Sequence, residues 1–249
     1  MSTGAIAMVG FSVTRCAAWA PGVSSPEEWD AWARGERAVG GDDLPPLREM
    51  PAMLRRHAGR LGRMACDVAY RALDGATGVP MVYASRHGDA ARSVELLTDL
   101  AEGAPLSPTS FSLSVHNAVA GLFSIARRDR ANIVALSAGE ASAAHGVIEA
   151  CGLIADGAPE VLLVVAESEI PPVHQAFDDI HSMPFAWAWL ITAAQDAPVE
   201  LTWERAPAHA APARLPEPAA LDVLRFWLRG DRDLVHEAGS HRWRWSRRA

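Results

Sequence analysis

The chain has 249 residues, of which 49% are hydrophobic and 21% charged, a composition typical of a globular protein with a substantial core. Its formal net charge of −7 argues against nucleic acid as the main partner. Three cysteines without a C-x-x-C pair predict a reducing, cytoplasmic location, and we find neither a secretory signal nor an apolar run near the ~20 residues of a membrane span.

The first half of the sequence alternates short apolar runs with stretches of helical periodicity. Residues 5–13 and 80–85 are rich in β-forming residues and predict buried strands. A helix should begin after Ser25, because a serine N-cap, Pro26 at the first helical position and Glu28 three residues after the serine form a capping box. Apolar residues at helical spacing predict three further helices, over residues 61–73, 93–100 and 117–126.

The segment from Asn132 to Glu167 gives the clearest indication of fold class. Residues 132–137 predict a short strand, residues 140–155 a helix of small residues, and residues 161–166 a strand buried on both faces. A strand, a sharp turn, a helix and a second strand make a βαβ unit. We therefore expect an α/β fold with a mixed or parallel sheet covered by helices.

The last third of the chain is less regular. Residues 185–192 and 199–203 could form a hairpin, a proline- and alanine-rich connection follows over 206–218, and a helix should end at Gly230. The terminal run of alternating tryptophan and arginine predicts an edge strand, or else a dock for an acidic acyl carrier protein or a partner subunit. We expect residues 1–205 to form the main domain, with 206–249 a linker, helix and strand packed on it.

Several central motifs resemble the N-terminal half of the β-ketoacyl synthases, enzymes of the thiolase fold. They are SPTSFSLSVHNAVAGL from Ser107, NIVALSAGEASAAH from Asn132, the IADG run from Ile154 with the strand that follows it, and the turn Ser85–Gly88. The likeness extends over about residues 5 to 190. It implies a layered mixed sheet covered by helices, as one half of the usual duplicated ketosynthase fold.

The resemblance also implies that the chain is catalytically incomplete. In this family a cysteine nucleophile projects from a strand-to-helix turn, where backbone N–H groups and the helix dipole favour the thiolate. The motif places Glu140 at that position, and a carboxylate cannot form a thioester. The family's two catalytic histidines sit in glycine-rich motifs, whereas His209, His236 and His241 are not framed by glycines. We expect no catalytic residue, no cofactor and no metal.

Chain-length factors are members of this family that lack the nucleophile and pair with an active ketosynthase. Similarity to those of bacterial aryl polyene pathways implies a heterodimer or heterotetramer with a full-length ketosynthase, and an acyl carrier protein would be only an indirect partner of this chain. The strand at Asn132–Ser137 would lie near the twofold interface. The candidate tunnel and interface positions are Phe111, Leu113, Ser114, His116, Asn117, Asn132, Val134, Leu136 and Glu140.

Other interpretations remain open at this level. Glu140 could be an ordinary acid at a helix N-terminus, or the acid/base of an acyl-processing enzyme. The chain could instead be a scaffold that only stabilises its partner. Serine hydrolysis is disfavoured because no G-x-S-x-G motif is present. A metal site at His174 and His181 is disfavoured because their spacing matches no H-E-x-x-H motif.

Overall fold

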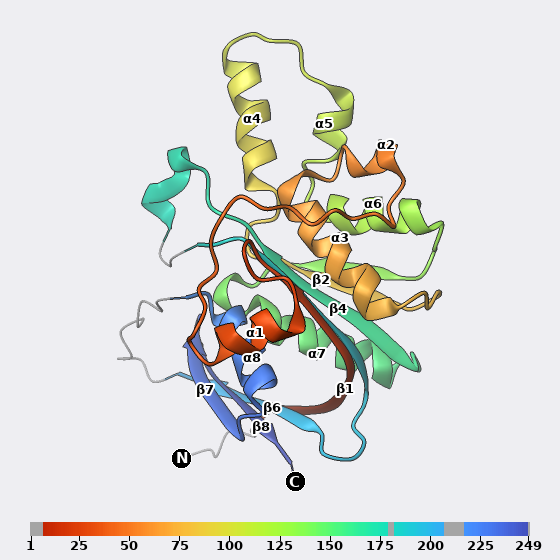
Figure 1. The fold of residues 1–249 in the computed structure, drawn as a ribbon, viewed down its shortest axis with the longest axis vertical. Helices are drawn as coiled ribbons and strands as arrows, with labels where there is room; N and C mark the ends of the chain where they lie inside the picture. The colour runs from red at the N-terminus through yellow and green to blue at the C-terminus, as the bar shows by residue number, and fades with distance from the viewer. Residues whose placement is uncertain (1–6, 179–181, 207–216, 249) are drawn as a thin grey trace.

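One mixed β-sheet with helices on both faces forms the centre of the computed structural model (Figure 1), which describes residues 7–178, 182–206 and 217–248. Its eight strands in the described residues run in the order β3-β2-β4-β5-β1-β6-β8-β7. The strands are β1 Ala7–Trp19, β2 Met81–Ala84, β3 Ile133–Leu136, β4 Glu160–Glu167, β5 Phe185–Ala193, β6 Val199–Arg205, β7 Asp233–Ala238 and β8 His241–Arg247.

The parallel part of the sheet comes from the predicted strand–helix–strand unit. Strand β2 pairs in parallel with both β3 and β4, whereas β4, β5, β1, β6, β8 and β7 pair with one another antiparallel in that order. A crossover helix is the connection that parallel strands require. The expected mixed sheet is confirmed.

The helices are α1 Pro26–Ala33, α2 Ala52–Arg55, α3 Gly59–Leu73, α4 Ala90–Ala101, α5 Pro108–Ser112, α6 Ala118–Arg127, α7 Ser142–Ala155 and α8 Ala219–Arg229, with 3₁₀ turns η1 Gly139–Ala141 and η2 Pro172–Phe177. The capping box is present: the Ser25 hydroxyl accepts from Glu28 N–H at 3.3 Å, and the Glu28 carboxylate accepts from Ser25 N–H at 3.1 Å. Helix α8 ends, as expected, at Gly230, whose φ of 68° is the left-handed conformation that glycine adopts readily. None of the described helices is long and apolar enough to cross a membrane.

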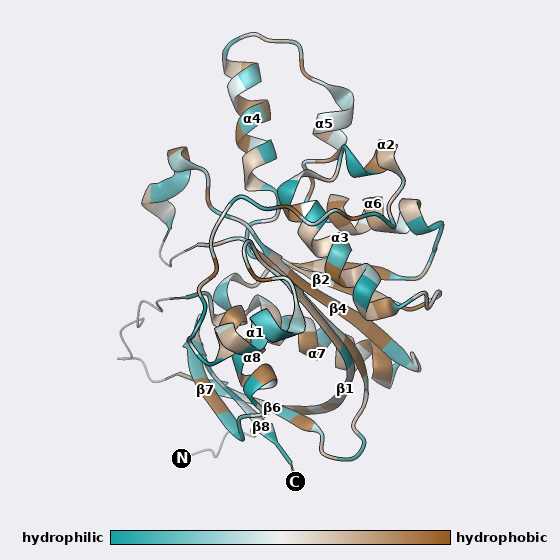
Figure 2. Cartoon of the chain, in the orientation of Figure 1, coloured by the Kyte–Doolittle hydropathy of each residue, from teal (hydrophilic) through white to brown (hydrophobic). Residues whose placement is uncertain are grey.

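Alternate residues of the central strands supply two separate cores, one on each face of the sheet. Strand β4 directs Val161, Leu163 and Val165 to the face covered by α1, α7 and α8, and Leu162 and Val164 to the face covered by α3 and α6. Figure 2 shows the apolar colour along this strand. Burial on both faces is what its continuous apolar sequence predicts.

Three expectations differ from the structure. The strand expected over residues 5–13 continues to Trp19, through an irregularity between Val13 and Arg15. Strands β5 and β6 form no hairpin, because β1 lies between them and pairs with both. The terminal strand β8 is not at an edge, because β7 pairs with its outer side. Strand β7 was not predicted, because its Asp, His and Glu residues hide the strand pattern. The connection at 207–216 lies outside the described residues.

Candidate functional site at the start of helix α7

The site is a tight turn between the end of β3 and the first residue of α7. Gly139 adopts a φ of 59°, a conformation that favours glycine, and Glu140 lies in the 3₁₀ turn directly before the helix. The Ser142 hydroxyl holds this turn closed: it accepts from Ala138 N–H at 3.1 Å and donates to the Gly139 carbonyl at 2.7 Å. The sequence thus places the acidic side chain of Glu140 at the N-terminus of α7.

Both carboxylate oxygens of Glu140 accept hydrogen bonds. Arg86 Nη1 lies 2.6 Å from Glu140 Oε1, and the two side chains are only 13% and 17% exposed. Glu140 Oε2 accepts from the backbone N–H of Ala219 at 3.3 Å. That group is the first N–H of α8, whose N-cap residue Pro218 supplies no side-chain acceptor. Glu140 therefore caps a helix that begins 79 residues further along the chain.

Arg86 joins three parts of the site through its backbone and its side chain. Its N–H donates to Glu167 Oε1 at 2.5 Å, and its carbonyl accepts from the Ser137 hydroxyl at 2.7 Å. Burial raises the pKa of Glu167 to about 8, and the nearby Glu140 carboxylate also raises it, while hydrogen bonds from the Arg86 and His87 N–H groups lower it. The backbone of Arg86 thus joins the ends of β2, β3 and β4, and its guanidinium binds Glu140.

The pocket beside Glu140 is small. It is lined by residues that include Arg86, Glu167, Met183 and Pro218, and its volume is about 20 Å³. Such a space holds about one water molecule. An acyl chain does not fit in this pocket as the described residues form it.

The predicted interface residues fall into two groups. Asn132, Val134 and Leu136 lie at the edge strand β3, where Asn132 is exposed and the other two are partly buried. Residues 111–117 form the end of α5 and the turn into α6.

In this second group, Phe111 is 66% exposed and Asn117 is also exposed, whereas Leu113 and Ser114 are partly buried. His116 connects the group to the site, because its Nε2 lies 2.9 Å from the carbonyl of Ser85, the residue before Arg86.

Sequence reasoning missed the groups that surround Glu140. Arg86 lies in the Ser85–Gly88 turn that suggested the family, but a lone arginine after a strand carries no signal of its partner. Glu167 ends a buried strand, and Ala219 contributes only its backbone. No residue-type pattern marks such a backbone donor.

The remaining titratable candidates have structural positions. His236 is buried in β7, and desolvation lowers its pKa to about 4. The ring of His241 packs against Trp243 with 5.6 Å between centroids. Across the described ranges no cluster of three His, Cys, Asp or Glu side chains could hold a metal ion, and His181 and His209 lie outside those ranges.

Comparisons with known proteins identify the family of the fold. The family model described as "Beta-ketoacyl synthase, N-terminal domain" matches residues 29–246. One chain of the complex of a ketosynthase (ApeO) with its chain length factor (ApeC) from Xenorhabdus doucetiae is similar, with a TM-score of 0.85 and 30% identity over 96% of this chain and 100% of that one.

Two further structures show the same fold at lower identity. A β-ketoacyl synthase from Burkholderia phymatum STM815 has a TM-score of 0.66 and 16% identity, over 88% of this chain and 69% of that one. The ishigamide ketosynthase/chain length factor has a TM-score of 0.60 and 17% identity, over 79% and 68%. A search of curated proteins gave no match.

Proposed function

Since this chain belongs to the β-ketoacyl synthase family and has its thiolase-like fold, we propose that it is a non-catalytic, chain-length-factor-like partner of a ketosynthase. The supporting observation is the state of Glu140. A condensing enzyme needs a free thiolate at this turn, whereas here a carboxylate binds Arg86 and caps α8. The site is built to hold the fold together at the point where a ketosynthase would hold an acyl group.

The edge strand β3 is the surface that fits the ketosynthase. It is short, contains only Ile133, Val134, Ala135 and Leu136, and no described strand pairs with its outer side. The opposite edge, β7, carries Asp233 and Glu237, and charges protect a sheet edge against pairing. Only the β3 edge of the sheet lacks charged residues. This favours one specific partner at that edge.

Exposed apolar side chains on and after helices α4 and α5 support the proposal of a partner. Leu97 and Leu100 on α4, Phe111 on α5 and Val115 after it are all exposed, and no residue of α4 is buried. In Figure 1 helices α4 and α5 project from the body of the molecule. An apolar patch of this kind marks an interaction surface. We expect an interface of about 2,000 Å² or more in total.

The small volume of the pocket beside Glu140 bears on how such a subunit would influence the length of the acyl chain. Because the space beside Glu140 holds only about a water molecule, the acyl tunnel would lie in the ketosynthase and at the interface. Phe111, Leu113, Ser114, His116 and Asn117 would shape its end. The product would be a polyketide or fatty-acid-type chain of the aryl polyene kind, with the acyl carrier protein delivering to the ketosynthase.

A matched pair of edge variants tests the proposal. Val134→Lys on β3 should abolish co-purification with the co-expressed ketosynthase, whereas Val235→Lys on β7, an exposed valine at the other edge, should leave it unchanged. Size-exclusion chromatography measures the complex, and product mass spectrometry measures chain length. A complex that survives Val134→Lys would contradict the proposed surface.

The rival functions predict different results in the same assay. An acyl-processing enzyme that uses Glu140 as acid or base would lose nearly all turnover in Glu140→Gln, whereas a tunnel-shaping subunit would keep it. A pure scaffold would give unchanged product lengths when Phe111 is replaced by tryptophan or alanine. Both carboxylate oxygens of Glu140 already accept hydrogen bonds, from Arg86 and from the Ala219 N–H. This favours the non-catalytic proposal.

A further inference from the structure

Helices α4 and α5 project from the body of the molecule, and little apolar burial holds them there (Figure 1). We call residues 90–112, which contain both helices and their connection, the arm. All residues of α4 and α5 are at least partly exposed, and Leu97 and Leu100 on α4 are each 60% exposed. One side of α5 borders an open space of about 340 Å³ that it shares with α2 and α6. A segment with so few buried contacts opens easily unless its ends are fixed.

An arginine fixes the start of the arm. Asp89 is the N-cap of α4 and accepts from the Arg92 N–H at 3.2 Å, while Arg92 Nε lies 3.1 Å from Asp89 Oδ2. Arg92 Nη2 also donates to the carbonyl of His57, two residues before α3, at 3.0 Å. The side chains of Asp89 and Arg92 are only 16% exposed. Arg92 thus ties the first turn of α4 to the start of α3.

A histidine fixes the chain just after the arm. His116 Nε2 lies 2.9 Å from the carbonyl of Ser85, and because a carbonyl oxygen can only accept, this ring nitrogen carries the proton. The ring packs on the buried side chain of Tyr83, with 5.8 Å between centroids. It also lies close to Gly88, where a Cβ atom would be 3.1 Å from His116 Cδ2. His116 thus ties the turn after α5 to the end of β2.

These two contacts lie close together at the base of the arm. Asp89 and Arg92 from the first contact, and Leu113, three residues before His116, line one cavity of only about 10 Å³. That volume is at most enough for one water molecule. The base of the arm is therefore closely packed, whereas the helices beyond it are not. Residues 111–117 follow directly from α5 at this base, so the same contacts determine where they lie.

We propose that Arg92 and His116 are positioning residues that set the length of the acyl chain by holding the arm, and with it residues 111–117, in place. This proposal rests on the proposed function, in which residues 111–117 shape the end of the acyl tunnel. A tunnel end that is held firmly stops chain growth at one length, whereas a tunnel end that yields admits longer chains. Neither Arg92 nor His116 has to touch the acyl group, because each acts through the position of the residues that do.

A purely structural role for these two residues predicts a different result. Removing either contact would then lower the stability of the chain and the amount of complex, but the products would keep their length. The hydrogen-bond donor of His116 separates the two roles. If the donor holds the arm, a side chain that keeps the donor should restore the product length, and one that keeps only the ring should not.

The test uses the full chain co-expressed with the ketosynthase. His116→Phe keeps an aromatic ring on Tyr83 but removes the donor to Ser85, whereas His116→Gln keeps an N–H donor at about the same reach. Arg92→Ala removes the other contact at the base.

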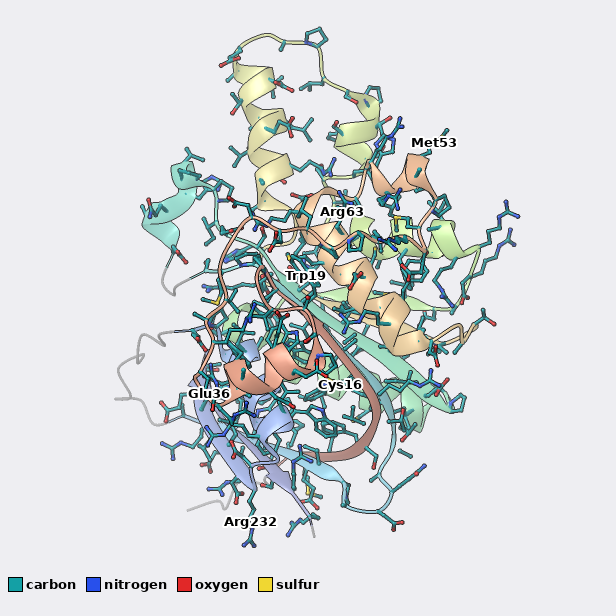
Figure 3. The ribbon with its side chains drawn as sticks, viewed as in Figure 1. Cys16, Trp19, Glu36, Met53, Arg63 and Arg232 are labelled. Atoms are coloured by element: carbon teal, nitrogen blue, oxygen red, sulfur yellow. The ribbon has the colours of Figure 1, made fainter. Side chains whose placement is uncertain are left out.

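Two matched controls lie away from the arm. His241→Phe replaces a partly buried ring on β8 that also packs on an aromatic side chain, Trp243. Arg232→Ala replaces an exposed arginine that pairs with a neighbouring aspartate and lies at the opposite end of the molecule from the arm (Figure 3).

Mass spectrometry of the products should show a broader distribution, shifted to longer chains, for His116→Phe and Arg92→Ala. His116→Gln and both controls should give the product lengths of the parent chain. Size-exclusion chromatography should show the complex for every variant, because none of them changes β3. In the isolated chain, hydrogen exchange over residues 90–112 should be about fivefold faster in His116→Phe and Arg92→Ala, the factor that corresponds to loss of about one hydrogen bond.

Several results would overturn the proposal. A complex that forms but makes products of unchanged length with His116→Phe and Arg92→Ala would overturn it and leave the proposed function intact. Equal shifts in His116→Phe and His116→Gln would show that the donor to Ser85 does not set the length. Unchanged hydrogen exchange over residues 90–112 would show that these contacts do not hold the arm. If the parent chain forms no complex with the ketosynthase, the proposed function fails, and this proposal fails with it.

Discussion

Replacing Glu140 by alanine should cost about 4 kcal/mol of folding free energy. Removing one partner of a buried ion pair costs about 3–5 kcal/mol, since the remaining charge loses a counter-charge. We take the lower end because Arg86 and Glu140 keep 13% and 17% of their exposure. Loss of the cap on the Ala219 N–H adds about 1 kcal/mol. Glu140→Gln keeps the side-chain volume and an acceptor oxygen, so it should cost about half as much.

Urea unfolding of the full chain measures these losses, and a double-mutant cycle isolates the pair. Arg86→Ala and the double variant complete the cycle, which should give a coupling energy of about 1–3 kcal/mol. Hydrogen exchange should increase in the first turn of α8 in Glu140→Ala. Glu149→Ala, a partly buried glutamate on α7, is the matched control and should cost under about 1 kcal/mol. A loss for Glu140→Ala no larger than this control, or a coupling energy near zero, would refute the reasoning.

Three further predictions follow from buried titratable groups. The pKa of Glu167 is raised from 4.5 to about 8, so its protonated form stabilises the fold fully below pH 4.5. This contribution is lost as the pH rises to 8. Glu167→Gln should therefore flatten the dependence of the urea unfolding midpoint on pH between 4.5 and 8. The pKa of His236 is lowered from 6.5 to about 4, so stability is lost as the pH falls from 6.5 towards 4, and His236→Gln should reduce the acid sensitivity measured by circular dichroism. Burial raises the pKa of Cys66 to about 12, so a thiol reagent at pH 8 should label Cys66 only after denaturant is added, and rapid labelling of the native chain would contradict its burial.

The elements that could be predicted are those whose burial follows a regular period. Strand β4 is apolar at every position from Val161 to Ala166 because both faces of the sheet are covered, and α1 begins at a capping box. Both signals are local. The order of the strands is not local: β1 lies between β5 and β6 because its partners come from the far end of the chain. The short helices α2 and α5 lack enough turns for a periodic pattern.

The candidate site was predictable only as far as Glu140 itself. The turn after β3 and the small residues of α7 place that carboxylate at a helix terminus by spacing alone. Its partners come from residue 86 and residue 219, and one of them is a backbone N–H. A sequence shows which groups can pair, but the fold decides which of them meet. The structure shows which groups Glu140 contacts, and its placement at the nucleophile position stays a prediction from the family resemblance.

The contacts of Glu140 suggest why this chain keeps a carboxylate at residue 140, the position that we propose corresponds to the family's nucleophile. The Arg86 side chain is only 13% exposed, and a guanidinium so largely removed from water needs a counter-charge. The first N–H of α8 also needs an acceptor, because Pro218 offers none. A cysteine at residue 140 could satisfy neither requirement as well as a carboxylate does. Substitution there would thus remove the nucleophile and brace α8 in one step, and Glu140→Cys should weaken the fold without creating a condensing enzyme.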